Sequence, residues 1–371
     1  MSIINSVSSS SKRQTSIELL RIICMLLIIT HHCIGHGGAA YMETCSNRII
    51  GLALIPGGKI CFNAFLAISA WFMVDQTFKT EHFFRTWLQV LFYSVCFAAV
   101  SYFCGASIEA NDWFGAFLPI AGNSHGFAAA YLALYLLMPF LKIITENLTR
   151  KQAKIIVLSL LYFEVGTQII GSFTQYFQPL SSELVLFIMC YFIAYYLKKY
   201  PLKIQKSRFA MGIIFIICWI LVFLIIYLYL VEMPQSLIMS YFWNIIKDES
   251  SIFNIVGGYA LFFIFYNTKL PSIQGINKIS KHVFGVLLMH DNNFFRTILW
   301  LQLIKTVKWY YSPYFLLYVL LATTGIFVIG IIIDFLREQL LEKPILKLTC
   351  IQKLCLEGDK IYNEKCNIKK I

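Results

Sequence analysis

The stretch SIELLRIICMLLIITHHCIGHGG, residues 16–38, decides the fold and raises the question of function. Its apolar centre, residues 22–29, suits the hydrocarbon of a membrane. Ionisable side chains lie on both sides of that centre: Glu18 and Arg21 precede it, and three histidines follow it. Such groups are costly inside a membrane segment and usually serve a pathway, a ligand or a reaction. The stretch is therefore both a predicted span and a candidate site.

The composition predicts an all-α, polytopic integral membrane protein. Of the 371 residues, 58% are hydrophobic and only 13% are charged, whereas about a quarter of a typical soluble domain is charged. The formal net charge of +12 would suit nucleic acid in a soluble protein. Here the lysines and arginines are expected to mark cytoplasmic loops, and no nucleic-acid partner is predicted.

The count of apolar segments gives the expected topology. A helical span needs roughly 20 apolar residues. Ten segments qualify or nearly qualify, at 17–37, 50–74, 84–105, 126–146, 155–173, 183–199, 210–231, 250–267, 282–303 and 314–335. The expected outer loops 106–125 and 174–182 contain no Lys or Arg, which favours ten spans with both termini cytoplasmic in the cell (inner) membrane. The ninth segment is interrupted by HDNN at 290–293.

One membrane domain is the simplest division of the chain. We expect a cytoplasmic tail at 1–15, a membrane domain at 16–335 and a basic cytoplasmic tail at 336–371. The tail cysteines Cys350, Cys355 and Cys366 lack the spacing of metal ligands, so no metal site is predicted there or elsewhere.

Helical geometry aligns most of the ionisable residues of the first segment. At 100° per residue, the 11 residues from Arg21 to His32 return to within about 20° of the same direction. Glu18 and His36 lie about 40° to either side of His32, while His31 points about 100° away. In one interpretation this stripe is functional, because histidine suits proton abstraction and arginine holds phosphate or an oxyanion. In the other, Arg21 reaches the interface and the histidines only cap the helix.

A second candidate stretch is KHVFGVLLMHDNNFFRTILW, residues 281–300. His290 and Asp291 follow an apolar run deep in the ninth segment, and Arg296 lies farther along. Polar residues at that depth need a wet or protein-lined cavity. They form either part of a site or a structural helix break.

Four motifs in order give the chain a resemblance. Arg21, ten residues and His32 match the first-span signature of the acyltransferase 3 family of bacterial membrane acyltransferases, with Glu18 where members commonly carry an acidic residue. FLAISAWFMV at 65–74 is similar to its second-span motif FFxLSGF, and AAYLALYLLMPFLKIIT at 129–145 to its YLxLYLLxPFLN segment. FGVLLMHD at 284–291 resembles its late GxYLIH stretch.

The resemblance implies a membrane O-acyltransferase. Acetyl would pass from cytoplasmic acetyl-CoA, a substrate rather than a permanently bound cofactor, to a hydroxyl of a cell-surface or lipid-linked glycan. On this reading His32 is the general base and Arg21 holds the donor. Glu18 orients Arg21, and His290 with Asp291 forms the opposite wall of the site.

Further residues are weaker candidates for binding the donor or the acceptor. Arg85 follows the second span, but Leu88 replaces the second arginine of the Arg-x-x-Arg pattern common in the family. Ser69 is either an acyl carrier or an interhelical hydrogen bonder. His36 and Arg296 complete the set. The tryptophans, including Trp71 and Trp300, are expected in the interfacial belt or in packing.

The best alternative from another class is a proton-coupled transporter or exporter. Intramembrane His, Arg and Asp in a chain of many spans also fit such a carrier. The sequence shows neither inverted repeats nor paired broken helices, which disfavours it. The sequence is compatible with a homo-oligomer.

Overall fold

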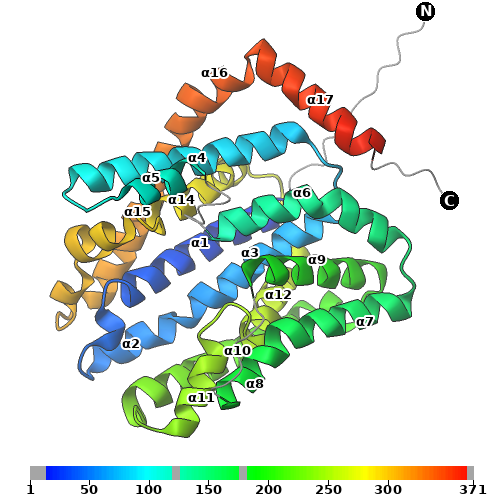
Figure 1. Cartoon of the computed structure of the whole chain (residues 1–371). Helices are drawn as coiled ribbons and strands as arrows, with labels where there is room; N and C mark the ends of the chain where they lie inside the picture. The colour runs from blue at the N-terminus through cyan, green and yellow to red at the C-terminus, as the bar shows by residue number, and fades with distance from the viewer. Residues whose placement is uncertain (1–13, 119–125, 175–181, 366–371) are drawn as a thin grey trace, which may run out of the picture.

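The computed structural model describes residues 14–118, 126–174 and 182–365 (Figure 1). These residues form an all-helical bundle without a strand. Of the expected N-terminal tail, residues 1–13 lie outside the described part of the chain.

Seven helices are long and apolar enough to cross a membrane, as a multi-pass membrane protein requires. They coincide with seven of the ten expected segments. They are α1 (Thr15–Gly35), α2 with α3 (Ser46–Leu54 and Pro56–Met73), α4 (Thr80–Phe103), α6 (Gly126–Glu146), α7 to α8 (Arg150–Leu161 and Thr167–Thr174, joined by η2, Tyr162–Gly166), α10 with η4 (Arg208–Tyr227 and Leu228–Glu232), and α15 to α16 (Phe315–Arg337 and Lys343–Leu346, joined by η8, Glu338–Glu342).

The other three expected segments differ from long helices. Two are shorter helices, α9 (Glu183–Lys199) with 17 residues and α12 (Ile252–Tyr266) with 15. The expectation of a continuous span at 282–303 is wrong. Helix α14 (Val283–His290) ends at His290, and η6 (Ile298–Ile304) begins only after an intervening turn.

Asn292 explains that break. Its side-chain oxygen accepts a hydrogen bond from the Phe294 N–H at 3.0 Å, and its amide donates to the Tyr93 carbonyl of α4 at 3.3 Å. An asparagine side chain that bonds nearby backbone groups offers the chain an alternative to helix. The turn is thereby fastened to α4.

Shorter elements connect these helices. They are η1 (Ala39–Tyr41), α5 (Ala110–Phe117), η3 (Ile204–Lys206), α11 (Leu237–Ile246), α13 (Gln274–Ile279), η5 (Ser280–His282), η7 (Thr306–Trp309) and α17 (Thr349–Lys365).

Helix α1 lies in the middle of the bundle, between α3 and α15 (Figure 1). Leu20, Cys24 and Ile28 contribute to one hydrophobic core, which includes residues of α3, α9 and α12. Met25, Ile29 and Cys33 contribute to a second core with residues of α4, α14 and α15. Because residues four apart share a helix face, each core is served by its own row of side chains. The two cores leave α1 with little exposure to its surroundings.

The first span is less apolar but more buried than the most apolar span. The most apolar span, α10 with η4, has a mean hydropathy of 3.1 and is 22% buried, whereas α1 has 1.9 and is 56% buried. The polar residues of α1 are thus sheltered by other helices. Below, "the α17 end" means the end of the bundle with α17 and the start of α1, and "the histidine end" means the end of α1 that carries His31, His32 and His36 (Figure 1).

Candidate active site

A cluster of aromatic and titratable side chains surrounds His32. Its ring centroid lies 5.2 Å from that of His290 and 6.5 Å from that of Trp300. The Nδ1 atom of His32 lies 3.9 Å from Oδ1 of Asp291. Thus the helix break places two candidate residues of the second stretch directly against the first helix.

The backbone fixes the tautomer of His290. Its Nδ1 lies 2.7 Å from the carbonyl oxygen of Val286, and since a carbonyl only accepts, Nδ1 carries the proton. The neutral ring therefore has a lone pair on Nε2. That atom is buried and makes no hydrogen bond within the described residues, and the same is true of His32 Nδ1. Buried polar atoms normally have partners, so these two nitrogens are available to a bound hydroxyl or proton.

His31 faces a different helix, as the 100° offset predicts. Its Nδ1 donates to the Ile55 carbonyl at 2.8 Å. Its ring lies against Gly58 of α3, where any larger side chain would collide with it. His31 is therefore a packing residue between α1 and α3, and it provides a matched comparison for His32.

His36 and Arg296 lie at the outer edge of the cluster. The His36 ring centroid is 4.9 Å from that of His32, and Nη1 of Arg296 is 3.4 Å from Oδ1 of Asp291. Ligand atoms of His32, His36 and Asp291 all lie within 4.8 Å of one another, and their chemistry suits zinc. The Arg296 guanidinium on the same carboxylate disfavours a second cation there.

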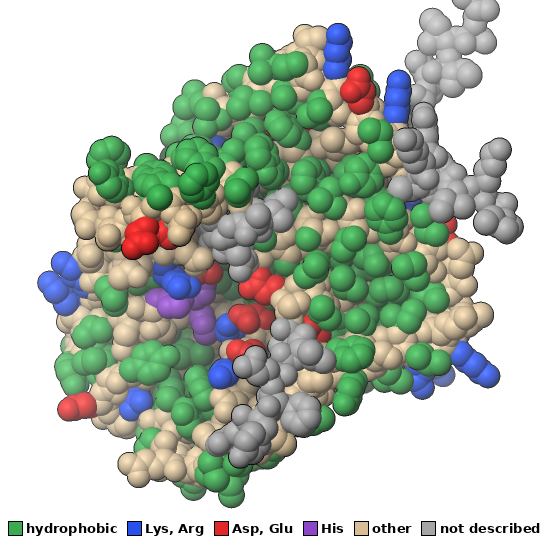
Figure 2. Space-filling view, viewed as in Figure 1, with side chains coloured by type: hydrophobic (Ala, Val, Ile, Leu, Met, Phe, Trp, Pro, Cys, Tyr) green, Lys and Arg blue, Asp and Glu red, His purple; other side chains and the backbone are tan. Residues whose placement is uncertain are grey.

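Figure 2 shows this region from outside. Histidine side chains lie in a depression of the visible face, and Lys or Arg and Asp or Glu side chains border them (Figure 2). The cluster is thus reachable from the surface at the histidine end.

Glu18 and Arg21 lie toward the other end of α1. Arg21 Nε is 3.9 Å from Glu18 Oε2, and Glu18 also accepts a hydrogen bond from the Ser280 hydroxyl of η5. The Arg21 side chain is 35% exposed and the Glu18 side chain 11%. The 11 residues from Arg21 to His32 correspond to a rise of roughly 16 Å along the helix. The polar side chains along α1 therefore lie in two separate places, Glu18 with Arg21 toward the α17 end and His32 in the histidine cluster.

Arg85 belongs to an ion-pair network whose other members were not predicted from the sequence. Its Nη1 is 3.3 Å from Glu342, which also binds Arg337 at 2.6 Å. Arg337 in turn donates to Asp334 at 2.9 Å. His282 of η5 and Gln89 of α4 each lie 2.8 Å from the same Asp334 carboxylate. An aspartate and an arginine at the end of the apolar segment 314–335 were the available signal.

A family profile described as an acyltransferase domain, of the acyltransferase 3 type, matches residues 14–334. The chain belongs to the acyltransferase 3 family. The resemblance seen in the four motifs is thereby confirmed, and the protein is a membrane acyltransferase that uses an acyl donor and an acceptor. Neither a search of curated proteins nor a search of solved structures finds a match.

Of the remaining sequence candidates of this acyltransferase, Trp300 belongs to the histidine cluster. Ser69 is half-buried in α3 and makes no side-chain hydrogen bond within the described residues. Trp71 and Trp300 are both buried, as the packing role predicted for them requires. Of the tail cysteines, Cys350 is exposed and Cys355 buried, and Cys366 lies outside the described residues.

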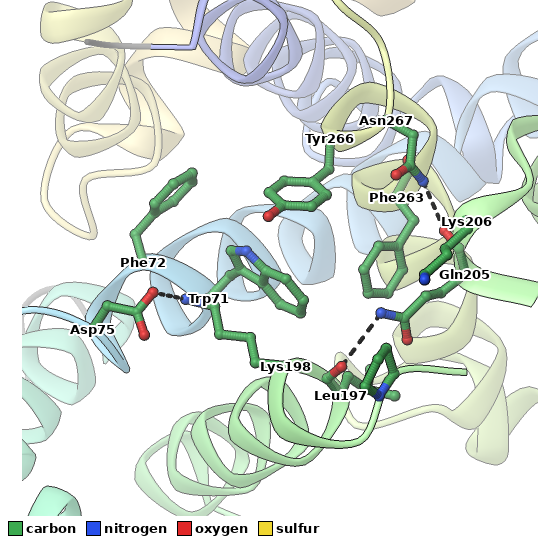
Figure 3. A pocket seen from close by; sticks show the side chains of 11 residues that line it. Trp71, Phe72, Asp75, Leu197, Lys198, Gln205, Lys206, Phe263, Tyr266 and Asn267 are labelled. Carbon is green, nitrogen blue, oxygen red and sulfur yellow. Dashed lines mark hydrogen bonds and ion pairs between the residues drawn. The ribbon is translucent and has the colours of Figure 1, made fainter. Parts of the chain in front are cut away.

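A separate cavity of about 580 Å³ lies at the α17 end of α3, α9 and α12 (Figure 3). The rings of Trp71, Phe263 and Tyr266 line it, as do two lysines. One of these, Lys198, is paired with Asp75, and its Nζ lies 5.0 Å from the Trp71 ring centroid. The cavity contains none of the site residues expected from the sequence.

Proposed function

We propose that the protein is an O-acetyltransferase that moves acetyl from cytoplasmic acetyl-CoA to a hydroxyl of a cell-surface or lipid-linked glycan. The proposal includes ten membrane crossings, the ninth of them broken between α14 and η6, with both termini cytoplasmic in the inner membrane. The observation that carries it is the cluster of His32, His290 and Asp291 in a membrane acyltransferase. Two ring nitrogens of this cluster, His32 Nδ1 and His290 Nε2, are buried and make no hydrogen bond within the described residues.

The chemistry follows from that arrangement. The acceptor hydroxyl oxygen attacks the thioester carbonyl of the donor, and His32 takes the hydroxyl proton. The carbon–sulfur bond breaks, CoA leaves as a thiolate, and the proton then passes from His32 to that thiolate. Asp291, 3.9 Å from His32 Nδ1, favours the charged imidazolium formed in between. A positioned general base typically contributes about 10²–10⁴-fold to the rate.

His290 supports this reaction from the opposite side. Its Nδ1 is held by the Val286 carbonyl, so the lone pair on Nε2 has a fixed direction. A second hydroxyl of the acceptor that donates to His290 Nε2 would orient the reacting hydroxyl toward His32. Trp300 packs on both rings, 6.3 Å from His290 between centroids, and limits the access of water.

Arg21 and Arg85 supply positive charge at the α17 end, where the donor would enter. Arg21 is half-exposed and steadied by Glu18, which Ser280 holds in turn. A guanidinium suits the phosphates of CoA or the polarised thioester oxygen. The donor would therefore extend along α1 toward the histidine cluster, while the acceptor approaches from the histidine end.

The test is a comparison of neighbouring histidines. The O-acetyl content of surface glycan is measured by NMR in cells with wild-type protein, His32→Ala, His31→Ala or no protein, at matched membrane levels. We expect acetylation to be lost with His32→Ala and retained with His31→Ala. Purified protein should also release free CoA thiol when a suitable acceptor is added.

Two outcomes would count against the proposal. Acetylation that persists without the protein would show that glycan acetylation in those cells is not its activity. A proton-dependent flux without consumption of acetyl-CoA would favour the transporter instead.

A further inference from the structure

A non-helical loop, residues 247–251, is held between helices at the histidine end. Asn63 of α3 donates to the Glu249 carbonyl at 2.9 Å, and Asn254 of α12 donates to the Asp248 carbonyl at 2.9 Å. Gln168 of α8 donates to the Asp248 carboxylate at 2.9 Å. These three amide side chains are almost fully buried, with exposures of 0%, 0% and 2%. Three separate helices thus fix the position of one short loop.

The loop presents the carboxylate of Glu249 to Lys59 of α3, with which it forms an ion pair. The two side chains keep 35% and 28% of their surface exposed, so the pair is accessible. Burial raises the pKa of the Glu249 carboxyl, but the Lys59 ammonium outweighs that effect, and the pKa lies below its ordinary value. The Glu249 carboxyl therefore favours its ionised form beside Lys59.

This pair borders the candidate active site. Both its members interact electrostatically with His31, the neighbour of His32. Glu183, at the start of α9, interacts with both members and also with Asp291. The Glu183 carboxylate lies against Gly126 at the start of α6, where a side chain would displace it. Lys59 also interacts electrostatically with His32 and His36, so the ion pair lies near the histidine cluster.

Two buried polar atoms near these residues lack a hydrogen-bond partner within the described part of the chain. His290, whose ring centroid lies 5.2 Å from that of His32, is fully buried, and its Nε2 makes no hydrogen bond there. The Asn63 side-chain oxygen next to the loop is also buried without a hydrogen bond. Buried polar atoms normally have a partner, and a bound ligand or water would supply one here.

The charges at this surface indicate which acceptors it would take. Three acidic side chains, Glu183, Glu249 and Asp291, lie here with two basic ones, Lys59 and Arg296. The excess of one carboxylate disfavours a ligand with a carboxylate or phosphate of its own. Carboxylates accept hydrogen bonds from hydroxyls and an ammonium donates to them, so the set suits a neutral ligand with several hydroxyl groups.

We propose that Lys59, Glu249 and Glu183 bind the acceptor beside the histidine cluster and select an uncharged sugar unit over an acidic one. This inference rests on the proposed function and names the acceptor class for the same site.

The experiment uses the purified full-length protein with acetyl-CoA and two sets of probes. One set contains methyl glycosides of neutral hexoses. The other contains the methyl glycosides of the matching uronic acids, each with a free carboxylate and called uronides below. We expect CoA release with neutral members and at most about a tenth of that rate with uronides. Loss of a hydrogen bond to a charged group commonly costs a factor of ten or more. Glu249→Gln and Lys59→Met should therefore raise KM for the neutral glycoside about tenfold without changing KM for acetyl-CoA.

Two further variants separate binding from folding. Glu183→Lys should narrow the preference for neutral over acidic probes, which a structural defect would not do. The double exchange Lys59→Glu with Glu249→Lys keeps an ion pair. If the pair is only structural, KM for the neutral glycoside should return to the wild-type value. If the pair binds the acceptor, that KM should stay raised. Exposed Glu232→Gln and Lys308→Met, at the same end of the bundle, are the matched controls.

The outcomes distinguish this inference from the proposed function. If acetyl-CoA does not bind, or is never consumed in cells that contain the protein, the proposed function fails. If acetyl-CoA binds but uronides alone, or none of the glycosides, are acetylated, the acceptor inference is overturned. Unchanged KM values in Glu249→Gln and Lys59→Met overturn it as well.

Discussion

At the scale of single residues, the position of Asp291 decides how His32 can work. Asp291 follows His290 at the end of α14, and its carboxylate lies between His32 at 3.9 Å and Arg296 at 3.4 Å. A carboxylate near an imidazole favours the protonated ring and restricts its orientation. Asp291 is therefore a positioning residue for the proposed base rather than a group that reacts.

This assignment predicts a specific kinetic effect of Asp291→Asn. The amide keeps the shape of the side chain but cannot stabilise the imidazolium, so we expect kcat to fall about 10²-fold. KM for acetyl-CoA should not change, because the donor would lie toward Arg21. Steady-state CoA release measures both constants, with exposed Asp75→Asn as the control. An unchanged kcat, or a rise in KM alone, would contradict the role.

Helical geometry was enough to predict from the sequence that His31 and His32 point in different directions. The 100° rotation separates His31 from His32, and the structure places one against α3 and the other against α14. The partners of these residues could not be read in the same way. Trp300 and the pair of Lys59 with Glu249 reach the site through tertiary packing, and the pair joins residues 190 apart in the chain. An isolated lysine in the apolar segment 50–74 was the only local signal.

At the scale of elements, Asp334 ties three parts of the bundle together. It lies on α15 and accepts hydrogen bonds from Gln89 of α4, from Arg337 and from His282 of η5. Asp334 is 1% exposed and Arg337 5% exposed. Breaking a buried pair leaves an uncompensated charge, which is far more costly than breaking an exposed pair.

The expected consequence is a large difference between two aspartate variants. Asp334→Asn should lower the free energy of unfolding by about 3–5 kcal/mol. Asp75→Asn, whose side chain is 72% exposed and paired with Lys198, should cost about 1 kcal/mol or less. Thermal unfolding in detergent, followed by tryptophan fluorescence, compares their Tm values. Equal shifts in Tm would show that the buried network does not hold α4, α15 and η5 together.

The ninth expected segment shows the limit of prediction for elements. Its composition is apolar enough for a span, and HDNN at 290–293 was a visible warning. Whether such a run bends or merely buries its polar groups depends on a partner, here the Tyr93 carbonyl that receives the Asn292 amide. The local sequence does not specify that partner, which lies on α4.

At the scale of the whole molecule, the arrangement of α1 gives the protein two chemically different ends. Arg21 and Glu18 lie toward the α17 end, and His32 lies among the residues of the histidine end. Transfer from a cytoplasmic donor to an outer glycan needs the α17 end inside the cell and the histidine end outside. The excess of Lys and Arg in the expected inner loops favours that orientation.

Native cysteines can test this orientation without new reporter sites. Cys104 follows α4 at the histidine end and Cys350 lies at the start of α17, and both are exposed. In spheroplasts, a membrane-impermeant maleimide should label Cys104, and it should reach Cys350 only after the membrane is permeabilised. Peptide mapping by mass spectrometry identifies the labelled residue, and Cys104→Ser is the control for the outer signal.

The reverse pattern would place the histidine cluster on the cytoplasmic side and exclude the proposed approach of the acceptor. Labelling of both cysteines in intact spheroplasts would place Cys350 outside as well, which an even number of spans with cytoplasmic termini does not allow.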